Sequence, residues 1–249
     1  METVFIEETD STNNWIAQNE KNLTAPVVVR CHTQRAGRGQ RGNSWESEPG
    51  KNFTGSVLLK PESFPASRQF LLSEAVALAV KDTLEEYGIK AKVKWPNDIY
   101  VGNKKICGIL VEHVVTGCNI TRTIAGIGVN VNQECFYSDA PNPTSMVIET
   151  GRIYNLEEVS EKLGENIGRR VGIPDTLADG ISVNPESLHS EFTASLWRND
   201  GQFHPFIDKK RGETILARIE NVGFDGMLTV TTDSGEKREF AFKEIEFVI

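Results

Sequence analysis

The feature that most limits the possible folds of this chain is an amphipathic helix between two groups of β-like segments. Over residues 68–87 the apolar side chains recur at helical spacing, and Gly88 follows where a helix would end. The β-like runs lie at 26–32 and 53–59 before this helix, and at 91–101, 104–113 and 121–132 after it. This mixture of hairpins and long helices predicts an α+β fold with helices covering one face of a sheet.

Turn and capping signals extend this prediction in both directions. Residues 102–103, Gly-Asn, are a favourable hairpin turn between two of the β-like runs. The apolar pair at 5–6 leads into 10–13, a cluster of N-cap formers that predicts a strand, a turn and a helix. Further helices are predicted at 155–171 and 185–197.

The sequence changes character after Trp197. Residues 199–205 are polar and turn-prone, and we expect them to form a link. Short β-like runs follow at 213–220, 227–232 and 237–242. A segment of roughly 45 residues with this pattern predicts a compact antiparallel barrel, which is too small to be very stable unless it docks on the rest. We therefore predict two domains, 1–200 and 201–249.

Composition and charge exclude several classes of protein. A net charge of -8 and a pI near 5.2 argue against bulk attraction to nucleic acid or to an anionic membrane. Residues 1–8 are acidic where a signal peptide would be basic, and no apolar stretch is long enough to span a bilayer, so we expect a cytoplasmic protein. The cysteines contain no C-x-x-C pair and the histidines lack metal-ligand spacing, so we expect neither disulfides nor a zinc site.

Residues 37–45, called the glycine loop below, have the composition of an anion-binding segment. They read Gly-Arg-Gly-Gln-Arg-Gly-Asn-Ser-Trp. The glycines leave backbone N–H groups unshielded, and Arg38 and Arg41 offer guanidinium forks that bind phosphate oxygens. Trp45 offers a flat face for a purine. Because neither a Walker A ending nor a Rossmann spacing is present, a basic surface loop with a half-buried tryptophan is the alternative.

A second candidate group surrounds the predicted hairpin. Lys94, Asn97 and Asp98 precede the turn, and Pro96 among them removes a ladder donor, so this stretch is predicted at a sheet edge or a bulge. Asp98 could hold a lysine, bind Mg²⁺ or cap a turn.

The two lysines that follow the hairpin turn, Lys104 and Lys105, are expected to differ. Strand alternation places Lys105 on one face with Cys107 and Ile109, and Lys104 on the other. We expect one of them to be drawn toward the interior, where its ammonium needs an anion. The alternative is that both only flank a turn and keep a strand edge soluble.

Five segments, taken in order, resemble the motifs of biotin protein ligases. They are residues 10–13, the glycine loop, 94–98, 105–110 and 126–132. The resemblance is strong over residues 7–132 and looser through the helical part. The predicted barrel resembles its counterpart in the family in its length, its position and residues 243–245. The resemblance implies a mixed β-sheet backed by helices, of the biotin/lipoate ligase catalytic type, followed by a small SH3-like barrel.

The resemblance also implies a reaction in two steps. The biotin carboxylate attacks the α-phosphate of ATP in the presence of Mg²⁺, giving biotinyl-5′-AMP and pyrophosphate. A specific lysine of a biotin carboxyl carrier domain of a carboxylase then takes the acyl group as an amide. The implied ligands and partners are therefore biotin, ATP, Mg²⁺ and the carrier domain.

Carried onto this sequence, the resemblance implies a role for each matching residue. The biotin-binding set is Ser11, Thr12, Asn13, Gln34, Arg38, Gly39, Gln40, Lys105 and Gly108. The ATP-binding set is Gly37, Arg41, Trp45, Lys94, Asn97, Asn130 and Asn132. Lys105 is the principal catalytic candidate, with Arg38 and Arg41, because cations there would neutralise the charge that grows in the transition state. Asp98 is the candidate Mg²⁺ ligand. Simpler roles stay open: Ser11 and Thr12 as helix caps, Trp45 as packing, and Asn130 and Asn132 as partners of turn backbone.

Two positions depart from the family pattern. Many relatives carry Arg where this chain has Gln40, and often a basic residue where it has Asn43. We hypothesise that Arg41 or Arg38 compensates from within the same loop. Some relatives also carry an N-terminal DNA-binding helix-turn-helix. Because the motif at 10–13 begins almost at the chain start, we predict a ligase without DNA binding, either a monomer or a homodimer.

Two alternative functions remain at this stage. One is a lipoate or octanoate ligase or transferase of related fold, although the arginine–glycine signatures of those enzymes are not found here. The other is a catalytically silent biotin-binding module whose barrel recruits a partner.

Overall fold

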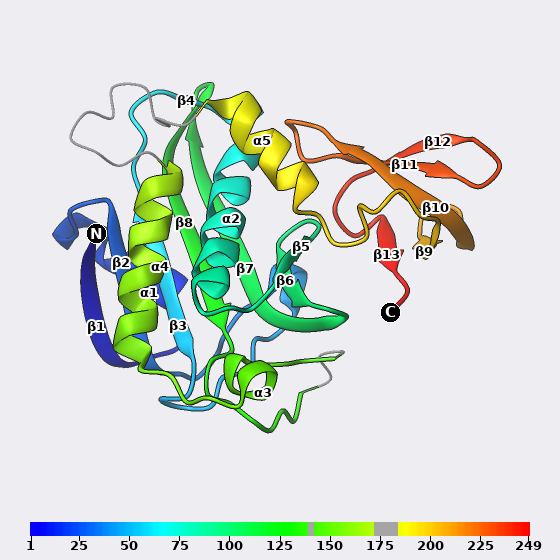
Figure 1. Cartoon of the computed structure of the whole chain (residues 1–249). Helices are drawn as coiled ribbons and strands as arrows, with labels where there is room; N and C mark the ends of the chain where they lie inside the picture. The colour runs from blue at the N-terminus through cyan, green and yellow to red at the C-terminus, as the bar shows by residue number, and fades with distance from the viewer. Residues whose placement is uncertain (139–141, 172–183) are drawn as a thin grey trace.

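The fold consists of two β-sheets, the first of which carries the helices (Figure 1). The computed structural model describes residues 1–138, 142–171 and 184–249, apart from the side chain of Arg41. Within these ranges the first sheet has eight strands and the second has five. The predicted fold class, a mixed sheet with helices followed by a small antiparallel β-structure, is confirmed.

The first sheet is mixed because one strand pair runs parallel. Its strands are β1 (Glu2–Thr9), β2 (Val27–Gln34), β3 (Phe53–Leu59), β4 (Phe64–Pro65), β5 (Lys92–Lys94), β6 (Asp98–Val101), β7 (Lys104–Thr116) and β8 (Asn119–Val129). Their order is β1-β2-β3-β8-β7-β6-β5, with β4 paired to β8 off this path. β1 and β2 are parallel, and the other pairs described are antiparallel. The predicted hairpin joins β6 to β7, and Gly102 in its turn takes a φ of 56°, which glycine adopts without strain.

Helices cover both faces of this sheet. They are α1 (Thr12–Asn19), α2 (Phe70–Glu86), α3 (Met146–Thr150), α4 (Leu156–Val171) and α5 (Pro185–Ala194). α2 and α4 lie side by side on one face, where Val28 and Val57 belong to the core beneath them. α1 lies on the opposite face, where Ile16 packs with Val27 and Leu58. The expectation that helices cover one face only is wrong, because β2 and β3 carry buried apolar residues at consecutive positions and both faces need cover.

Four segments differ from the sequence-based expectation. Residues 91–101 form two strands, β5 and β6, which are joined by a turn that contains Pro96 beside the edge strand β5. His204 and Pro205 begin a strand instead of belonging to a link, since pairing with residues 216–217 outweighs their local turn preference. The short elements α3 and Ile245–Phe247 were not predicted at all.

The second sheet is antiparallel and docks on the first part of the molecule. Its strands are β9 (His204–Asp208), β10 (Glu213–Val222), β11 (Leu228–Thr232), β12 (Lys237–Phe240) and β13 (Ile245–Phe247), in the order β12-β11-β10-β9-β13. The Trp95 indole N–H donates to the Gly226 carbonyl at 3.0 Å, and the Phe242 ring packs against Trp95 and Phe70. Buried residues of both parts belong to one core, which satisfies the requirement that so small a barrel be docked.

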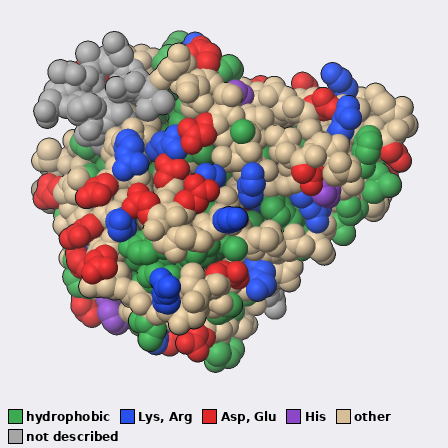
Figure 2. All heavy atoms as spheres, viewed as in Figure 1, with side chains coloured by type: hydrophobic (Ala, Val, Ile, Leu, Met, Phe, Trp, Pro, Cys, Tyr) green, Lys and Arg blue, Asp and Glu red, His purple; other side chains and the backbone are tan. Residues whose placement is uncertain are grey.

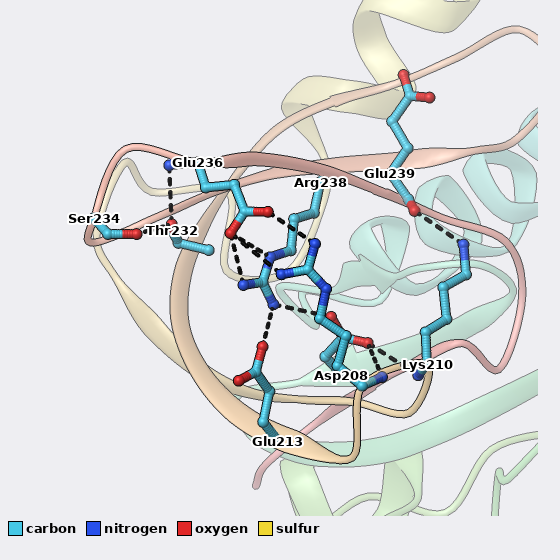
Figure 3. A network of polar contacts seen from close by, with 9 residues as sticks. Asp208, Lys210, Glu213, Thr232, Ser234, Glu236, Arg238 and Glu239 are labelled. Atoms are coloured by element: carbon cyan, nitrogen blue, oxygen red, sulfur yellow. Dashed lines mark hydrogen bonds and ion pairs between the residues drawn. The ribbon is translucent and has the colours of Figure 1, made fainter.

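A closed polar network stabilises the barrel (Figure 3). The Arg238 guanidinium bonds to Asp208 at 2.9 Å, Glu213 at 2.7 Å and Glu236 at 2.7 Å. The Asp208 side chain is only 2% exposed and also accepts the backbone N–H groups of Lys210 and Arg211. The donors and acceptors of this network bond to one another, so it offers few polar atoms to a ligand.

The face formed by α2 and α4 carries charges of both signs. Figure 2 shows acidic and basic side chains interspersed over these helices. Arg170 bonds to Asp82 of α2 and Glu191 of α5, and Lys162 bonds to Glu86. These charges are therefore paired with one another within the face.

Candidate functional site

A cavity of about 830 Å³ opens where the first sheet, the glycine loop and the barrel meet. Its size falls within the range typical of small-molecule sites. Most of the predicted site residues line it: Ser11, Thr12, Asn13, Gln34, Arg38, Gly39, Gln40, Trp45, Lys94, Asn97, Asp98, Lys105, Gly108 and Asn130. Gly37 and Asn132 do not line it, and the side chain of Arg41 lies outside the described part of the structure.

The start of α1 contributes a buried polar chain to one end of the cavity. Ser11, Thr12 and Asn13 are each less than a tenth exposed. The Thr12 hydroxyl lies 2.6 Å from Ser56 Oγ, and Ser56 Oγ donates to Asn13 Oδ1 at 2.6 Å. Gln34 Oε1 accepts the Thr12 backbone N–H at 3.0 Å. Ser11 occupies the N-cap position but makes no side-chain capping bond. These side chains are therefore held by each other, with polar atoms placed at the cavity wall.

Glu112 links these hydrogen-bonded side chains to the glycine loop. Asn13 Nδ2 donates to Glu112 Oε2 at 2.7 Å, and Arg38 donates to both oxygens of Glu112, at 3.1 and 2.9 Å. Neither Ser56 nor Glu112 was predicted from the sequence. Glu112 ends an apolar run, which is a weak signal, and Ser56 lies within a strand with no signal at all.

A second predicted cation of the cavity, Lys105, is paired with Asp98. Lys105 Nζ lies 2.7 Å from Asp98 Oδ1, and both side chains are about one-fifth exposed. Nζ also lies 5.5 Å from the Trp45 ring centroid, which places it beside the glycine loop. Lys104 is instead half exposed and pairs with Glu149. Of the two lysines, Lys105 is therefore the one drawn inward.

Lys105 lies on a different face of β7 from the one predicted, because the pairing of β6 with β7 is irregular. The register of β6 with β7 shifts between Ile99 and Tyr100, so that Tyr100 opposes Lys105 while Ile99 opposes Cys107. A Cβ added to Gly108 would lie 3.4 Å from Lys105 Cε, which shows that Lys105 shares the side of Gly108. Strict alternation placed it with Cys107 instead. The extra residue of the bulge brings the ammonium into the cavity.

Glycines of β7 and β8 form the floor on which Trp45 lies. Gly108 and Gly128 are directly paired across the two strands. A Cβ at Gly108 would come within 2.8 Å of the indole, and one at Gly128 within 2.3 Å. A Cβ at Gly126 would come within 2.5 Å of Asn13 Oδ1. The absence of side chains at these three positions is what lets Trp45 and Asn13 approach the sheet.

Lys94 lies where the cavity meets the barrel. Its ammonium is 5.3 Å from the Tyr100 ring centroid and 5.0 Å from that of Phe247, a barrel residue. Burial lowers the pKa of Lys94. A cation held between rings with its hydration reduced is well placed to meet an anion.

The two asparagines after β8 have different environments. Asn130 is buried and donates to the Thr144 carbonyl at 2.9 Å, and its Oδ1 has no hydrogen-bond partner among the described residues. Asn132 exchanges hydrogen bonds with the backbone of Tyr154, at 2.8 and 2.9 Å. Asn130 thus retains an acceptor next to the cavity, whereas Asn132 holds the backbone ahead of α4.

Comparison with known proteins agrees with this geometry. Residues 5–132 match the model of the biotin/lipoate A/B protein ligase family. The chain belongs to this family. A biotin–[acetyl-CoA-carboxylase] ligase of Paracoccus denitrificans is 33% identical over 172 residues, which are 66% of this chain and 71% of that protein. The bifunctional ligase/repressor BirA of Bacillus subtilis is 35% identical over 130 residues, or 52% of this chain, and the match spans only 39% of BirA.

The whole fold also has a counterpart among solved structures. The biotin protein ligase from Aquifex aeolicus in complex with biotin and ATP superimposes with a TM-score of 0.78. The match covers 99% of this chain and 98% of that chain at 24% sequence identity. It includes the C-terminal barrel, which lies beyond the residues matched by the family model.

Among the described residues, no group of three or more His, Cys, Asp or Glu side chains is placed to hold an ion.

All four cysteines are free thiols, and burial raises the pKa of Cys31 to about 12. In the same part of the chain, no helix is both long and apolar enough to cross a membrane.

Proposed function

We propose that this chain is a biotin protein ligase that activates biotin as biotinyl-5′-AMP and transfers it to a lysine of a biotin carboxyl carrier domain. One observation carries the proposal: Lys105, from a strand far along the sequence, lies in the same cavity as the arginine-bearing glycine loop, 5.5 Å from the Trp45 ring. Family membership and the 33% identical ligase of Paracoccus denitrificans support it.

The first step needs cations near the reacting oxygens. A biotin carboxylate oxygen forms a bond to the α-phosphorus of ATP, the bond from that phosphorus to the bridging oxygen breaks, and pyrophosphate leaves. Negative charge meets negative charge in this step, so fixed cations stabilise the transition state. Lys105 takes this role in our proposal, with Arg38 and Arg41 from the glycine loop. The ion pairs with Asp98 and Glu112 hold two of these cations in position before substrate arrives.

The second step consumes the mixed anhydride. The lysine amine of the carrier domain attacks the acyl carbon, AMP leaves and the amine loses a proton. In our proposal the biotin set is Ser11, Thr12, Asn13, Gln34, Arg38, Gly39, Gln40, Lys105 and Gly108. The nucleotide set is Gly37, Arg41, Trp45, Lys94, Asn97, Asn130 and Asn132. Gly37 and Asn132, which lie outside the cavity lining, would act by shaping the chain around it.

Mg²⁺ enters this proposal with the nucleotide. Magnesium at nucleotide sites is commonly bound by phosphates, water and one or two carboxylates, and it neutralises phosphate charge. Among the described residues the side chains fit that mode, with Asp98, the ion-pair partner of Lys105, as the candidate carboxylate. We also propose that residues 1–200 and 201–249 act as two domains, the second closing the cavity with Lys243, Phe247 and their neighbours.

The proposal is tested with an apo carrier domain. We expect incubation with this protein, ATP, Mg²⁺ and biotin to raise the mass of the carrier by one biotinyl group. Octanoate in place of biotin should give no mass change and no thermal shift of the protein. An unmodified carrier under conditions where a known ligase modifies it would overturn the proposal, and modification by octanoate alone would redirect it to the lipoate branch of the family.

A further inference from the structure

Lys243 of the barrel contacts the glycine loop. Its Nζ donates to the Gln40 carbonyl at 3.2 Å, although the two residues are 203 positions apart in the sequence. Both residues line the cavity. The contact therefore brings a cation from the barrel to the position in the loop where many relatives carry arginine and this chain carries a neutral side chain.

The turn that carries Lys243 is fixed by contacts on either side of that residue. The Glu244 carboxylate accepts the Ala241 N–H at 2.7 Å, and the Glu244 N–H donates to the Ala241 carbonyl at 3.1 Å. The Phe242 ring packs against Trp95 of the first part of the molecule, with the ring centroids 5.3 Å apart. The Lys243 side chain thus extends from an ordered backbone, so that less conformational freedom remains to be lost when its ammonium binds a ligand.

Lys243 has a backbone conformation that residues other than glycine rarely adopt. Its φ is 68°, in the left-handed region. Glycine takes this conformation without strain, so a lysine at this position lowers stability relative to glycine. Strained backbone conformations of this kind cluster at ligand-binding and catalytic sites. The conformation of Lys243 therefore supports a role for its side chain in binding a ligand.

The charge of Lys243 is available to a ligand, unlike that of several other cations in the cavity. Arg38 and Lys105 each pair with a carboxylate, and so does Lys209, the other barrel lysine in the lining. Within the described part of the chain, the Lys243 ammonium has no carboxylate partner and bonds to a neutral carbonyl. A phosphate oxygen can replace that carbonyl, since a hydrogen bond between two charged groups is stronger.

We propose that Lys243 binds the phosphates of the nucleotide and supplies from the barrel the cation that the glycine loop lacks at Gln40. This inference rests on the proposed function. When ATP enters the cavity, the Lys243 ammonium exchanges the Gln40 carbonyl for a phosphate oxygen. Arg38 is less suited to this compensation from within the loop, because its guanidinium already donates to both oxygens of Glu112. The barrel is therefore part of the nucleotide site and not only a cover over it.

The experiment compares two ligands by calorimetry with biotin present in excess. The probes are α,β-methylene-ATP, an analogue that cannot release pyrophosphate, and adenosine, which has no phosphates. In Lys243→Ala the Kd of the analogue should rise about tenfold, as expected for the loss of one hydrogen bond between charged groups. The Kd of adenosine should change less than about twofold, because no phosphate contact is lost. Lys243→Gly removes the ammonium and the backbone strain together and should give the same loss as Lys243→Ala. Lys237→Ala is the matched control, because it removes an exposed cation of β12 that lies outside the cavity lining, and it should bind both ligands as the wild-type chain does.

A double variant separates a phosphate contact from a purely structural one. Gln40→Arg restores a cation in the loop, so it should lower the Kd of the analogue at least about fivefold in the Lys243→Ala background and by less in the otherwise wild-type chain. Equal losses of analogue and adenosine binding, no loss in either Lys243 variant, an equal loss in Lys237→Ala, or equal effects of Gln40→Arg in both backgrounds would overturn the inference. Failure of the proposed function is a separate outcome, seen as no biotin binding and no pyrophosphate release by the wild-type chain.

Discussion

The cavity and the C-terminal barrel each contain a group of ion-paired side chains, but the two groups are built differently. In the barrel, Arg238 is only 12% exposed and bonds to three carboxylates, one of which is nearly inaccessible to solvent. In the cavity, Lys105 and Arg38 each pair with one carboxylate and keep about one-fifth to two-fifths of their surface exposed.

This difference separates structural charge from charge that is available to a ligand. The barrel network links strands that are close in sequence, and its donors and acceptors are used up. In the cavity, Arg38 pairs with Glu112, 74 positions away, Lys105 pairs with Asp98 of the neighbouring strand β6, and both cations line an open volume. Partly exposed pairs contribute little to stability, so their retention in a cavity is better explained by what they bind.

The largest expected effect tests the cavity side of the comparison. Lys105→Ala should lower biotin-dependent pyrophosphate release about a thousandfold, because it removes the cation that meets the charge growing in the transition state. The melting temperature should change by only a few degrees, since the lost pair with Asp98 is partly exposed. Lys104→Ala is the control and should retain full activity. Equal losses in the two variants would show that Lys105 has no special role.

The second prediction tests the barrel side. Arg238→Ala leaves the buried Asp208 carboxylate without its guanidinium partner, and we expect the free energy of unfolding to fall by about 2 kcal/mol in urea titrations. Arg211→Ala removes an exposed pair with Glu236 and should cost less than about 0.5 kcal/mol. Activity of folded Arg238→Ala should stay within about twofold of wild type. A large loss of activity with unchanged stability would overturn the comparison.

The smallest expected effect concerns the seam between the two regions. Glu74 of α2 is fully buried, its Oε1 lies 2.7 Å from His189 Nδ1, and the His189 ring stacks on Phe224 of the barrel at 4.3 Å. Burial raises the pKa of Glu74 to about 7, more than the opposing hydrogen bond and charge of His189 lower it. The neutral carboxyl is therefore favoured in the folded state. Its contribution to stability is complete below the unfolded pKa of about 4.5 and is lost as the pH rises through about 7.

Glu74→Gln should remove this pH dependence. We expect the variant to be more stable than wild type at pH 8 by about 1 kcal/mol, and the difference to shrink at pH 5. Thermal melts at the two pH values measure it. Glu85→Gln, on the exposed surface of the same helix, is the control and should leave the wild-type slope unchanged. A Glu74→Gln variant with that same slope would show that another group titrates.

Much of the fold could be predicted from the sequence because its signals are local. The apolar spacing at 68–87 gave α2, and alternating apolar runs gave most strands of both sheets. The strand β9 was missed because His204 and Pro205 favour a turn locally, and only pairing with β10 makes them part of a strand.

The site could be predicted in part, through motifs that lie within single segments. The glycine loop and the Lys105 segment were both found this way, and most of their residues line the cavity. Ser56 and Glu112 were missed because at most a weak signal in the neighbouring sequence marks them. Their importance comes from partners 43 to 99 positions away.

By itself, the amino-acid sequence determined the class of fold, the order of the motifs and the set of residues that could meet a carboxylate and a nucleotide. Periodicity, turn chemistry and residue type act over a few neighbours, so they are readable along the chain. Only the tertiary structure decided that a bulge brings Lys105 to the side of Gly108, and that Trp45 lies on paired glycines. It also decided that the Glu46 carboxylate accepts the backbone N–H groups of Tyr137 and Ser138. Those contacts depend on strand register and on close packing between distant segments, which no local pattern encodes.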